Sequence, residues 1–212
     1  MENGVDVDTY VYVDALNLYY GSLKDSPYRW LDLGSLCRSL LQDHAIGRIR
    51  YFTAIVRSRS GDPTQQQRQQ VYLRALRTIP ELTIHYGSFL TNAVRLPLAR
   101  PGLGSRRTVE VLRTEEKGSD VNLATRLLVD GFRGAYATAV VISNDSDLKA
   151  PIEAAHRELG LRVGVVIPNT RVRRSALPAD FYRRIRRGVL SVSQFPPTLS
   201  DTNGSFHRLR SW

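Results

Sequence analysis

The stretch AVVISNDSDLKA, from Ala139 to Ala150, determines the predicted fold of this chain. Its first residues are apolar and mostly β-branched, which predicts a buried strand, and the polar residues after Ile142 predict a tight turn that leads into a helix. In open parallel sheets, ligands bind at the carboxyl ends of the strands, so Asp145 and Asp147 lie where such folds place their chemistry. Helix capping is the alternative role, but a cap requires one carboxylate and this turn supplies two.

A second acid follows another predicted strand, near the N-terminus. In TYVYVD, from Thr9 to Asp14, valines alternate with tyrosines, which is the periodicity of a strand. Asn17 follows Asp14 three residues later. An Asp and Asn pair can also form a simple turn. We favour a functional role, because this strand is expected at the centre of the sheet and a turn does not require this pairing.

A third acid begins a predicted helix. Gly118 and Ser119 interrupt the chain and can cap a helix that runs from Asp120 to about Val129. An acid in the first turn also interacts favourably with the helix dipole. Asp130 lies about 15 Å further along the axis and faces another direction, so it cannot share a site with Asp120. We expect Asp130 to be an ordinary solvated residue near the helix end.

The remaining patterns predict an α/β fold, because strands alternate with helices as they do in βαβ units. Further strands are expected at 48–56, 82–90, 108–113 and 162–167, and further helices at 33–43, 64–79 and 148–159. A segment rich in Pro, Gly and Arg, at about 91–107, is expected to be an irregular excursion. Cys37 lies in an apolar helical pattern and is expected to be a small core residue.

The chain is expected to divide into two parts. Residues 1–168 would form one α/β domain, and residues 169–212 would form an Arg-rich extension that packs on it. Within the extension we expect a short helix at 177–187. A strap over the domain would follow from Ser191, with aromatic and proline residues as its anchors.

The composition points to a polyanionic partner. The 212 residues carry a formal charge of +10, which favours RNA, or alternatively DNA, over an anionic membrane because most of the excess is arginine. A single cysteine excludes a disulfide framework and favours the cytoplasm, and no apolar run is long enough to span a membrane. A homo-oligomer is left open. The arginines expected to bind nucleic acid are Arg171, Arg173, Arg174, Arg183, Arg184, Arg186 and Arg187.

The acids suggest a metal site. If the sheet is parallel, Asp14, Asp120, Asp145 and Asp147 lie along one edge, where their carboxylates repel one another. A hard divalent cation such as Mg²⁺ or Mn²⁺ removes this repulsion, and it lowers the pKa of bound water and neutralises charge on a phosphoryl oxygen. Clustered acids in a basic protein therefore suggest hydrolysis of phosphodiester bonds.

Three motifs resemble the NYN domains of the PIN-like nuclease superfamily. They are YVDALNLYYG, KGSDVNLATRLLVDGF and VVISNDSDLKAPI, and the resemblance runs from about Thr9 to Pro168. The SQFP sequence and the closing Trp212 resemble one bacterial branch of the family. The resemblance implies a Rossmann-like three-layer α/β/α sandwich with a mostly parallel sheet, and metal-dependent endoribonuclease activity.

The same resemblance assigns roles to the acids. Asp14, Asp120 and Asp145 would ligate Mg²⁺ or Mn²⁺, and Asp147 would bind through water or orient the attacking water. Asn17 would position Asp14 or the scissile phosphate. Ser143 and Asn144 would line the site.

Two alternatives remain open. Many NYN domains have another Asp one to two turns after the position of Asp120, where this chain has Arg126, which suggests an RNA-binding module with a degraded site. The same branch includes proteins described as pyridine-ring hydroxylases, so a small-molecule hydroxylase is the other alternative. No G-x-G-x-x-G fingerprint for a dinucleotide is present, which counts against the hydroxylase.

Overall fold

A seven-stranded sheet forms the centre of the computed structural model, which describes residues 9–56, 62–100, 107–168 and 177–209. The strand order is β4-β3-β2-β1-β5-β6-β7, and only the β3–β4 pair is antiparallel. The strands are β1 (Thr9–Asp14), β2 (Ile46–Ala54), β3 (Leu82–Pro97), β4 (Thr108–Lys117), β5 (Thr138–Ile142), β6 (Arg162–Ile167) and β7 (Phe181–Arg184). As predicted, β1 is the central strand.

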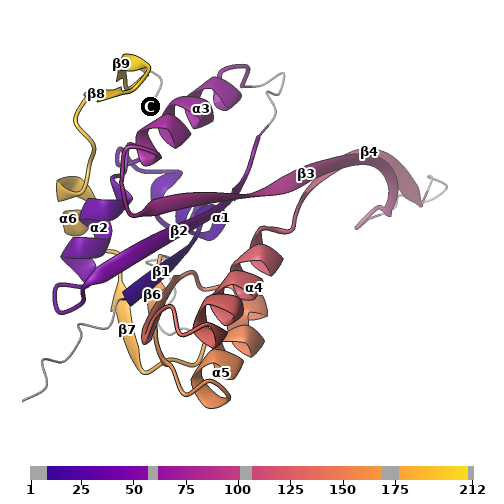
Figure 1. Cartoon of the computed structure of the whole chain (residues 1–212). Coiled ribbons are helices and arrows are strands. Elements are labelled where there is room, and N and C mark those ends of the chain that lie inside the picture. The colour runs from indigo at the N-terminus through magenta and orange to yellow at the C-terminus, as the bar shows by residue number, and fades with distance from the viewer. Residues whose placement is uncertain (1–8, 57–61, 101–106, 169–176, 210–212) are drawn as a thin grey trace, which may run out of the picture.

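Helices cover both faces of this sheet (Figure 1), which confirms the predicted α/β/α sandwich. One face carries α1 (Ala15–Leu18), the π-helical turn η1 (Tyr19–Leu23), α2 (Leu33–Leu40), α3 (Gln65–Leu76) and α6 (Arg187–Val192). The other carries α4 (Ser119–Phe132), the 3-10 turn η2 (Ser146–Leu148) and α5 (Lys149–Arg157). No helix in the described part of the chain has the length and apolar character to cross a membrane.

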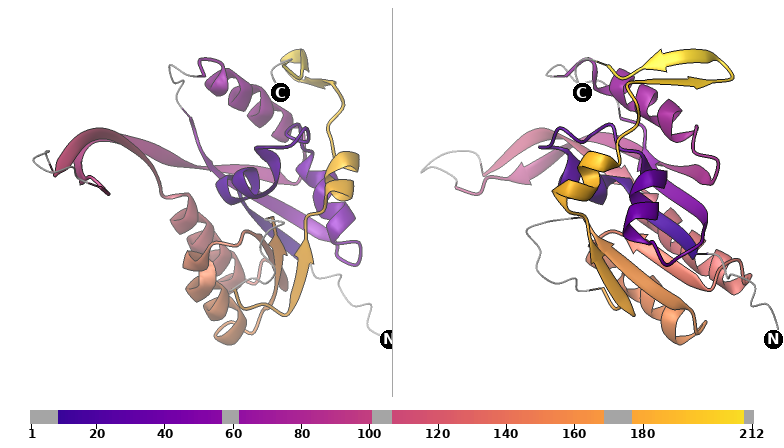
Figure 2. Two further views of the ribbon diagram at one scale, coloured as in Figure 1. Left: turned by 180° about the vertical axis from the view of Figure 1, so that it is seen from behind. Right: turned by 90° about the vertical axis from the view of Figure 1, so that its left-hand side faces the viewer.

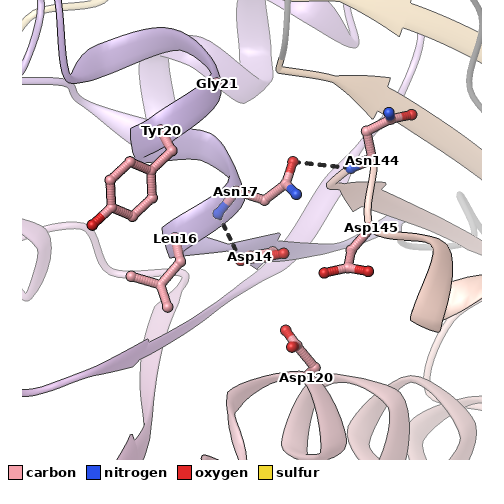
Figure 3. Close-up of a pocket in the computed structure, with 8 residues that line it drawn as sticks. All are labelled: Asp14, Leu16, Asn17, Tyr20, Gly21, Asp120, Asn144 and Asp145. Atoms are coloured by element: carbon pink, nitrogen blue, oxygen red, sulfur yellow. Dashed lines mark hydrogen bonds between the residues drawn. The ribbon is translucent and has the colours of Figure 1, made fainter. Parts of the chain in front are cut away.

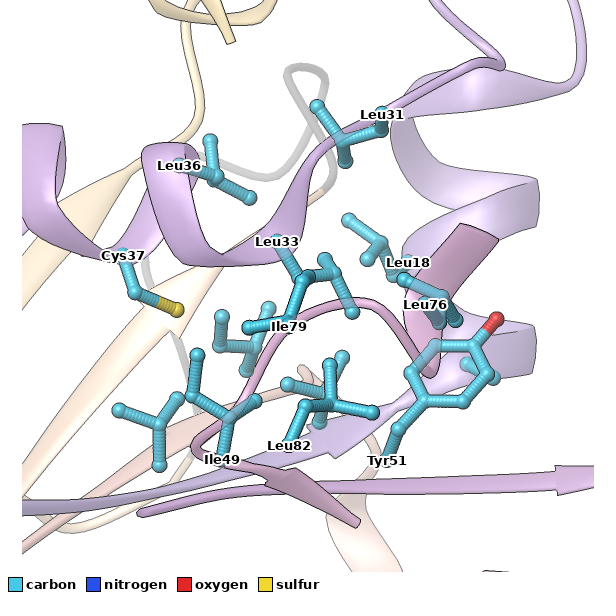
Figure 4. Packing of buried hydrophobic residues seen from close by; sticks show 14 of the residues in the cluster. Leu18, Leu31, Leu33, Leu36, Cys37, Ile49, Tyr51, Leu76, Ile79 and Leu82 are labelled. Atoms are coloured by element: carbon cyan, nitrogen blue, oxygen red, sulfur yellow. The ribbon is translucent and has the colours of Figure 1, made fainter. Parts of the chain in front are cut away.

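Alternation along the central strands builds the two cores. Val11 and Val13 pack under α2 and α3, whereas Tyr12 faces α4 on the other side of the sheet. A strand that is buried on both faces therefore needs large apolar or aromatic side chains at every position. Figure 4 shows the first core between α2 and the sheet, where Cys37 is fully buried, as predicted.

Asp130 corrects one expectation, because it is buried and not solvated. It is only 4% exposed and accepts two hydrogen bonds from Arg50 of β2, at 2.6 and 2.9 Å. The hydroxyl of Tyr12 donates a third, at 2.9 Å. Helical geometry places Asp130 away from Asp120, as we expected, but it turns the side chain toward the sheet.

The excursion expected at 91–107 is largely a β-hairpin. β3 does not end at residue 90 but continues to Pro97, and it pairs with β4 from Ser88 opposite Lys117 to Pro97 opposite Thr108. Figures 1 and 2 show this hairpin reaching well beyond the body of the sheet. The strand expected at 108–113 is present as the first part of β4. The strand at 91–97 was missed because both faces of the hairpin are solvated, so apolar and polar residues do not alternate there.

The C-terminal region also differs from expectation. The helix predicted at 177–187 is wrong: Phe181–Arg184 is an edge strand that pairs in parallel with β6, and a helix begins only at Arg187. The sheet therefore extends past residue 168. A small hairpin follows, made of β8 (Thr198–Asp201) and β9 (Gly204–His207), and its Phe206 is buried.

Candidate functional site

A pocket of about 540 Å³ opens where the carboxyl ends of β1 and β5 meet the start of α4. Figure 3 shows three carboxylates directed into it, each from a different segment of the chain. Its lining residues are Asp14, Leu16, Asn17, Tyr20, Gly21, Asp120, Asn144 and Asp145. Four of the five residues predicted to be catalytic thus lie together, with Asp147 as the exception.

Asp14 is held at the end of the central strand. Its Oδ1 accepts a hydrogen bond from the backbone N–H of Asn17 at 2.9 Å, and its Oδ2 accepts one from Ser143 Oγ at 2.9 Å. Burial raises the pKa of the Asp14 carboxyl, the neighbouring charge of Asp145 adds to the rise, and these two hydrogen bonds oppose it. Asp14 therefore caps α1 and also faces the pocket, so the two roles do not exclude each other.

Side-chain hydrogen bonds join the turn after β5 to the end of β1. Ser143 Oγ, fully buried behind Asp14, also accepts a hydrogen bond from the backbone N–H of Asp145 at 3.1 Å. Asn17 Oδ1 accepts one from the backbone N–H of Asn144 at 3.1 Å. These contacts fix the two acid-bearing turns relative to each other. The side chain of Asn144 points away from the acids in Figure 3.

Asp147 lies one step outside the pocket. Its backbone N–H donates to Asp145 Oδ1 at 3.0 Å, its side chain is exposed, and it does not line the pocket. It is nevertheless close enough for its charge to raise the pKa of Asp120. An acid at this position adds negative charge to the site but does not directly contact a ligand in the pocket.

Asp120 enters the pocket from the first turn of α4, and its pKa is raised to about 6. Burial is the largest cause, followed by the charges of Asp14, Asp145, Glu116 and Asp147. A carboxyl with this pKa is half-protonated near pH 6 when no cation is present. The repulsion among carboxylates expected from the sequence is therefore present at this site.

Glu116 is a neighbour of the site that the sequence analysis missed. It lies on β4, and its side chain accepts a hydrogen bond from the backbone N–H of Ser119 at 3.0 Å, which caps the start of α4. Gly87 makes room for it, because a Cβ there would overlap the Glu116 carboxylate and approach the backbone of Lys117 and Ser119 within 2.8 and 2.9 Å. The signal that could have identified this cap in the sequence is a Glu three residues before the first residue of α4.

The carboxylates supply the oxygen ligands that Mg²⁺ and Mn²⁺ prefer. Within the ranges that the structure describes, no three His, Cys, Asp or Glu side chains already form a group that could hold a metal ion. The acids of the pocket do face one space, and burial followed by their mutual repulsion raises the pKa of Asp120. In chemical type, three carboxylates from separate segments are a donor set that fits a hard divalent cation.

The predicted nucleic-acid-binding arginines form a separate group. Arg183, Arg184 and Arg186 line a second pocket of about 700 Å³ between β7 and the end of α2, together with Asp43. None of its lining residues belongs to the acidic pocket. Arg187 begins α6 beside it. Arg171, Arg173 and Arg174 lie outside the described residues.

Arg126 is exposed on α4, and its charge acts on His85 of β3. The pKa of His85 is lowered by burial first, then by Arg50 and by Arg126. The charges that raise the pKa of Asp120, after burial, come from other acids. These interactions associate Arg126 with the His85 side of α4.

Comparison with known proteins agrees with this architecture. The chain is 32% identical over 220 residues to the 6-hydroxy-3-succinoylpyridine 3-monooxygenase HspA of Pseudomonas putida, with 89% of this chain and 70% of the relative covered. The crystal structure of a protein of unknown function from Vibrio parahaemolyticus shares the fold, with a TM-score of 0.54 at 19% identity over 88% of this chain and 98% of the other. The NYN domain family matches residues 8–181. Because this match spans most of the sequence and crosses the acidic pocket, the chain belongs to the NYN domain family, as its motifs predicted.

Proposed function

We propose that this protein is a metal-dependent endoribonuclease whose active site is the pocket containing Asp14, Asp120 and Asp145. The observation that carries this proposal is the convergence of three carboxylates, from β1, the turn after β5 and α4, on one open pocket. The raised pKa of Asp120 supports it, because strongly perturbed acids in a cleft are typical of functional sites. Membership of a nuclease-like family points the same way.

Each acid has a role in this proposal that its position supports. Asp14, Asp120 and Asp145 would hold Mg²⁺ or Mn²⁺, and the exposed Asp147 would act through water. Asn17 holds the backbone of the facing turn through Asn144, so it keeps the Asp14 and Asp145 carboxylates on one side of the pocket. When bound, the ion would acidify a water molecule and stabilise negative charge on the phosphate.

The arginines of the second pocket would bind RNA through its phosphates, and the acidic pocket would hold the bond that is cleaved. Arg183, Arg184, Arg186 and Arg187 lie outside the acidic pocket, so they would contact phosphates at a distance from the cleaved bond. Arginine suits this role because its planar guanidinium forms paired hydrogen bonds with phosphate oxygens. The acids would repel RNA in the absence of a cation, so metal and RNA should bind cooperatively.

Cleavage of mixed RNA by the purified protein, with Mn²⁺ or with EDTA, tests the proposal. We expect cleavage only with Mn²⁺, and we expect Asp14→Asn and Asp145→Asn each to abolish it while the fold is kept. Glu158→Gln is the matched control, because Glu158 is an exposed acid at the end of α5. Full cleavage by both site variants would refute the proposed site. RNA binding without cleavage by the wild-type protein would favour the degraded-site alternative.

Ring hydroxylation is the second candidate, favoured by the 32% identity to a pyridine monooxygenase along most of this chain. Such a reaction would place one atom of O₂ on the ring and reduce the other to water, with two electrons from a reduced nicotinamide. Incubation with a hydroxypyridine, O₂ and NADH would test it. Substrate-dependent NADH oxidation that yields a hydroxylated ring, without RNA cleavage, would establish the hydroxylase in place of the nuclease.

A further inference from the structure

Tyr20 is an exposed aromatic residue at the mouth of the acidic pocket. Its side chain is 65% exposed, although it lines the same pocket as the three carboxylates. Figure 3 shows its ring beside Leu16, on the side of the pocket formed by α1 and η1. An exposed tyrosine contributes little to the core, so packing within this chain does not explain its position.

The backbone around Tyr20 directs it outward. It belongs to η1, a single π-helical turn that follows α1 without interruption. Leu18 and Leu23, on either side of it, are buried in the core and anchor the turn. Isolated π-helical turns are rare and are frequently found at functional sites.

Two neighbours contact the Tyr20 ring, which nevertheless stays 65% exposed. The Tyr19 ring lies edge-on at a centroid distance of 5.3 Å and an angle of 77°. The Nζ atom of Lys24 lies 5.2 Å from the Tyr20 ring centroid, which is within the range of a cation–π contact. These contacts orient the ring, and they place an ammonium group over one of its faces.

We infer that Tyr20 is the stacking surface for a planar aromatic ring of the substrate, whose reacting group lies among Asp14, Asp120 and Asp145. Stacking suits this position because aromatic side chains accept any base through its π-face. A nucleotide has its base one sugar away from its phosphate, so one nucleotide could contact both Tyr20 and the acids. The ammonium group of Lys24 would add attraction for an anionic substituent.

The aromatic ring could belong to a nucleobase of RNA or to a free hydroxypyridine, and these two sources can be separated. The assignment of the ring to RNA rests on the proposed function, whereas the assignment of Tyr20 as a stacking surface does not. The first probe is a short single-stranded RNA that contains 2-aminopurine, whose fluorescence falls when it stacks. The second is 6-hydroxynicotinic acid, measured by calorimetry.

Both probes are measured on the full chain with Mn²⁺ and with EDTA, and RNA cleavage is followed separately on gels. Tyr20→Leu should weaken the binding of whichever probe the wild-type protein binds, roughly 5- to 150-fold. For the RNA probe, it should also remove the quenching of 2-aminopurine fluorescence. Tyr20→Phe should behave as the wild-type protein does, because it keeps the ring. Phe132→Leu is the matched control, since Phe132 is an 82% exposed aromatic residue at the opposite end of α4.

The outcomes distinguish this inference from the proposed function. A Tyr20-dependent signal with RNA supports a base-stacking site, and one with 6-hydroxynicotinic acid alone supports a small aromatic substrate. Ring-dependent binding without RNA cleavage would leave the stacking surface in place and refute the nuclease. If Tyr20→Leu binds both probes as tightly as the wild type, if Tyr20→Phe loses as much as Tyr20→Leu, or if neither probe binds, the inference is overturned.

Discussion

Arg50 and Asp130 form a buried two-point ion pair between β2 and α4, with Nε to Oδ2 at 2.6 Å and Nη2 to Oδ1 at 2.9 Å. α4 carries Asp120 in its first turn and Asp130 near its last. The Tyr12 hydroxyl, two residues before Asp14, donates to the same Asp130 carboxylate. Asp130 therefore ties α4, which carries Asp120, to β2 through Arg50 and to β1, which carries Asp14, through Tyr12.

Arg50→Met should destabilise the protein by about 3–5 kcal/mol, because it leaves the Asp130 carboxylate buried without its counter-charge. The double variant Arg50→Met with Asp130→Leu should recover much of this loss, since no unpaired charge remains. Urea unfolding of both single variants and the double variant measures the coupling. A loss below about 1 kcal/mol in Arg50→Met would show that the ion pair is not important for stability.

Asp120→Asn should raise the melting temperature above pH 6 in EDTA. Folding raises the pKa of Asp120 to about 6, so the folded state favours the protonated acid. The resulting stability is complete below the unfolded pKa, near 4, and is lost as the pH rises through 6. Asn imitates the neutral acid, so the two melting temperatures should converge at pH 4 and separate at pH 7.5. A difference that does not change with pH would contradict this origin.

Ser143→Ala should weaken Mn²⁺ binding by about 10-fold or more, as the loss of outer hydrogen-bond partners commonly does. Ser143 Oγ stabilises the ionised form of Asp14 and also holds the backbone of Asp145. Its removal raises the pKa of Asp14 further and loosens the facing turn. Calorimetric titration checks this result. Ser191→Ala on the exposed side of α6 is the control.

Replacement of Arg183, Arg184, Arg186 and Arg187 with Gln should weaken RNA binding to a similar extent for all sequences. Each phosphate contact that is lost should lower the slope of log affinity against log salt by about 0.7, the value for a single strand. The control is Arg133→Gln with Arg157→Gln, two exposed arginines near the ends of α4 and α5. If the affinity and slope do not change in the fourfold variant, these arginines are solvated surface residues that do not contact RNA.

Arg126→Gln should leave Mn²⁺ affinity and stoichiometry unchanged, because the charge of Arg126 acts on His85. The same change should raise the pKa of His85 toward its ordinary value. Calorimetry measures the first effect and an NMR titration of the imidazole the second. Tighter Mn²⁺ binding in the variant would show instead that Arg126 competes with a cation at the acidic pocket.

The sequence was most informative where a residue's role depends on its own segment. Asp14 ends one apolar strand and Asp145 lies in the turn that follows another. The carboxyl ends of parallel strands meet at one edge, so the proximity of the two acids followed from local patterns. Asp120 followed because its helix start is marked by Gly118 and Ser119. The parallel order of the sheet then brought all three to one pocket.

The errors arose where the partner is distant in sequence. Asp130 is buried because Arg50, eighty residues earlier, neutralises it, and no pattern within α4 indicates that partner. β7 was mistaken for a helix because an Arg-rich edge strand lacks the apolar alternation of a half-buried one. Tyr20 received no role from the sequence, because local patterns do not indicate the π-helical turn that directs its side chain outward.

The Glu116 cap joins the β3–β4 hairpin to the acidic pocket. Only three residues separate Glu116 at the base of this hairpin from Asp120, and the absence of a side chain at Gly87 lets its carboxylate reach the helix start. The base of the hairpin and the start of α4 are therefore linked both by the chain and by this hydrogen bond. A ligand that displaces the base of the arm would therefore act on the segment that carries the Asp120 carboxylate, which makes the arm a route by which binding far from the pocket could alter the site.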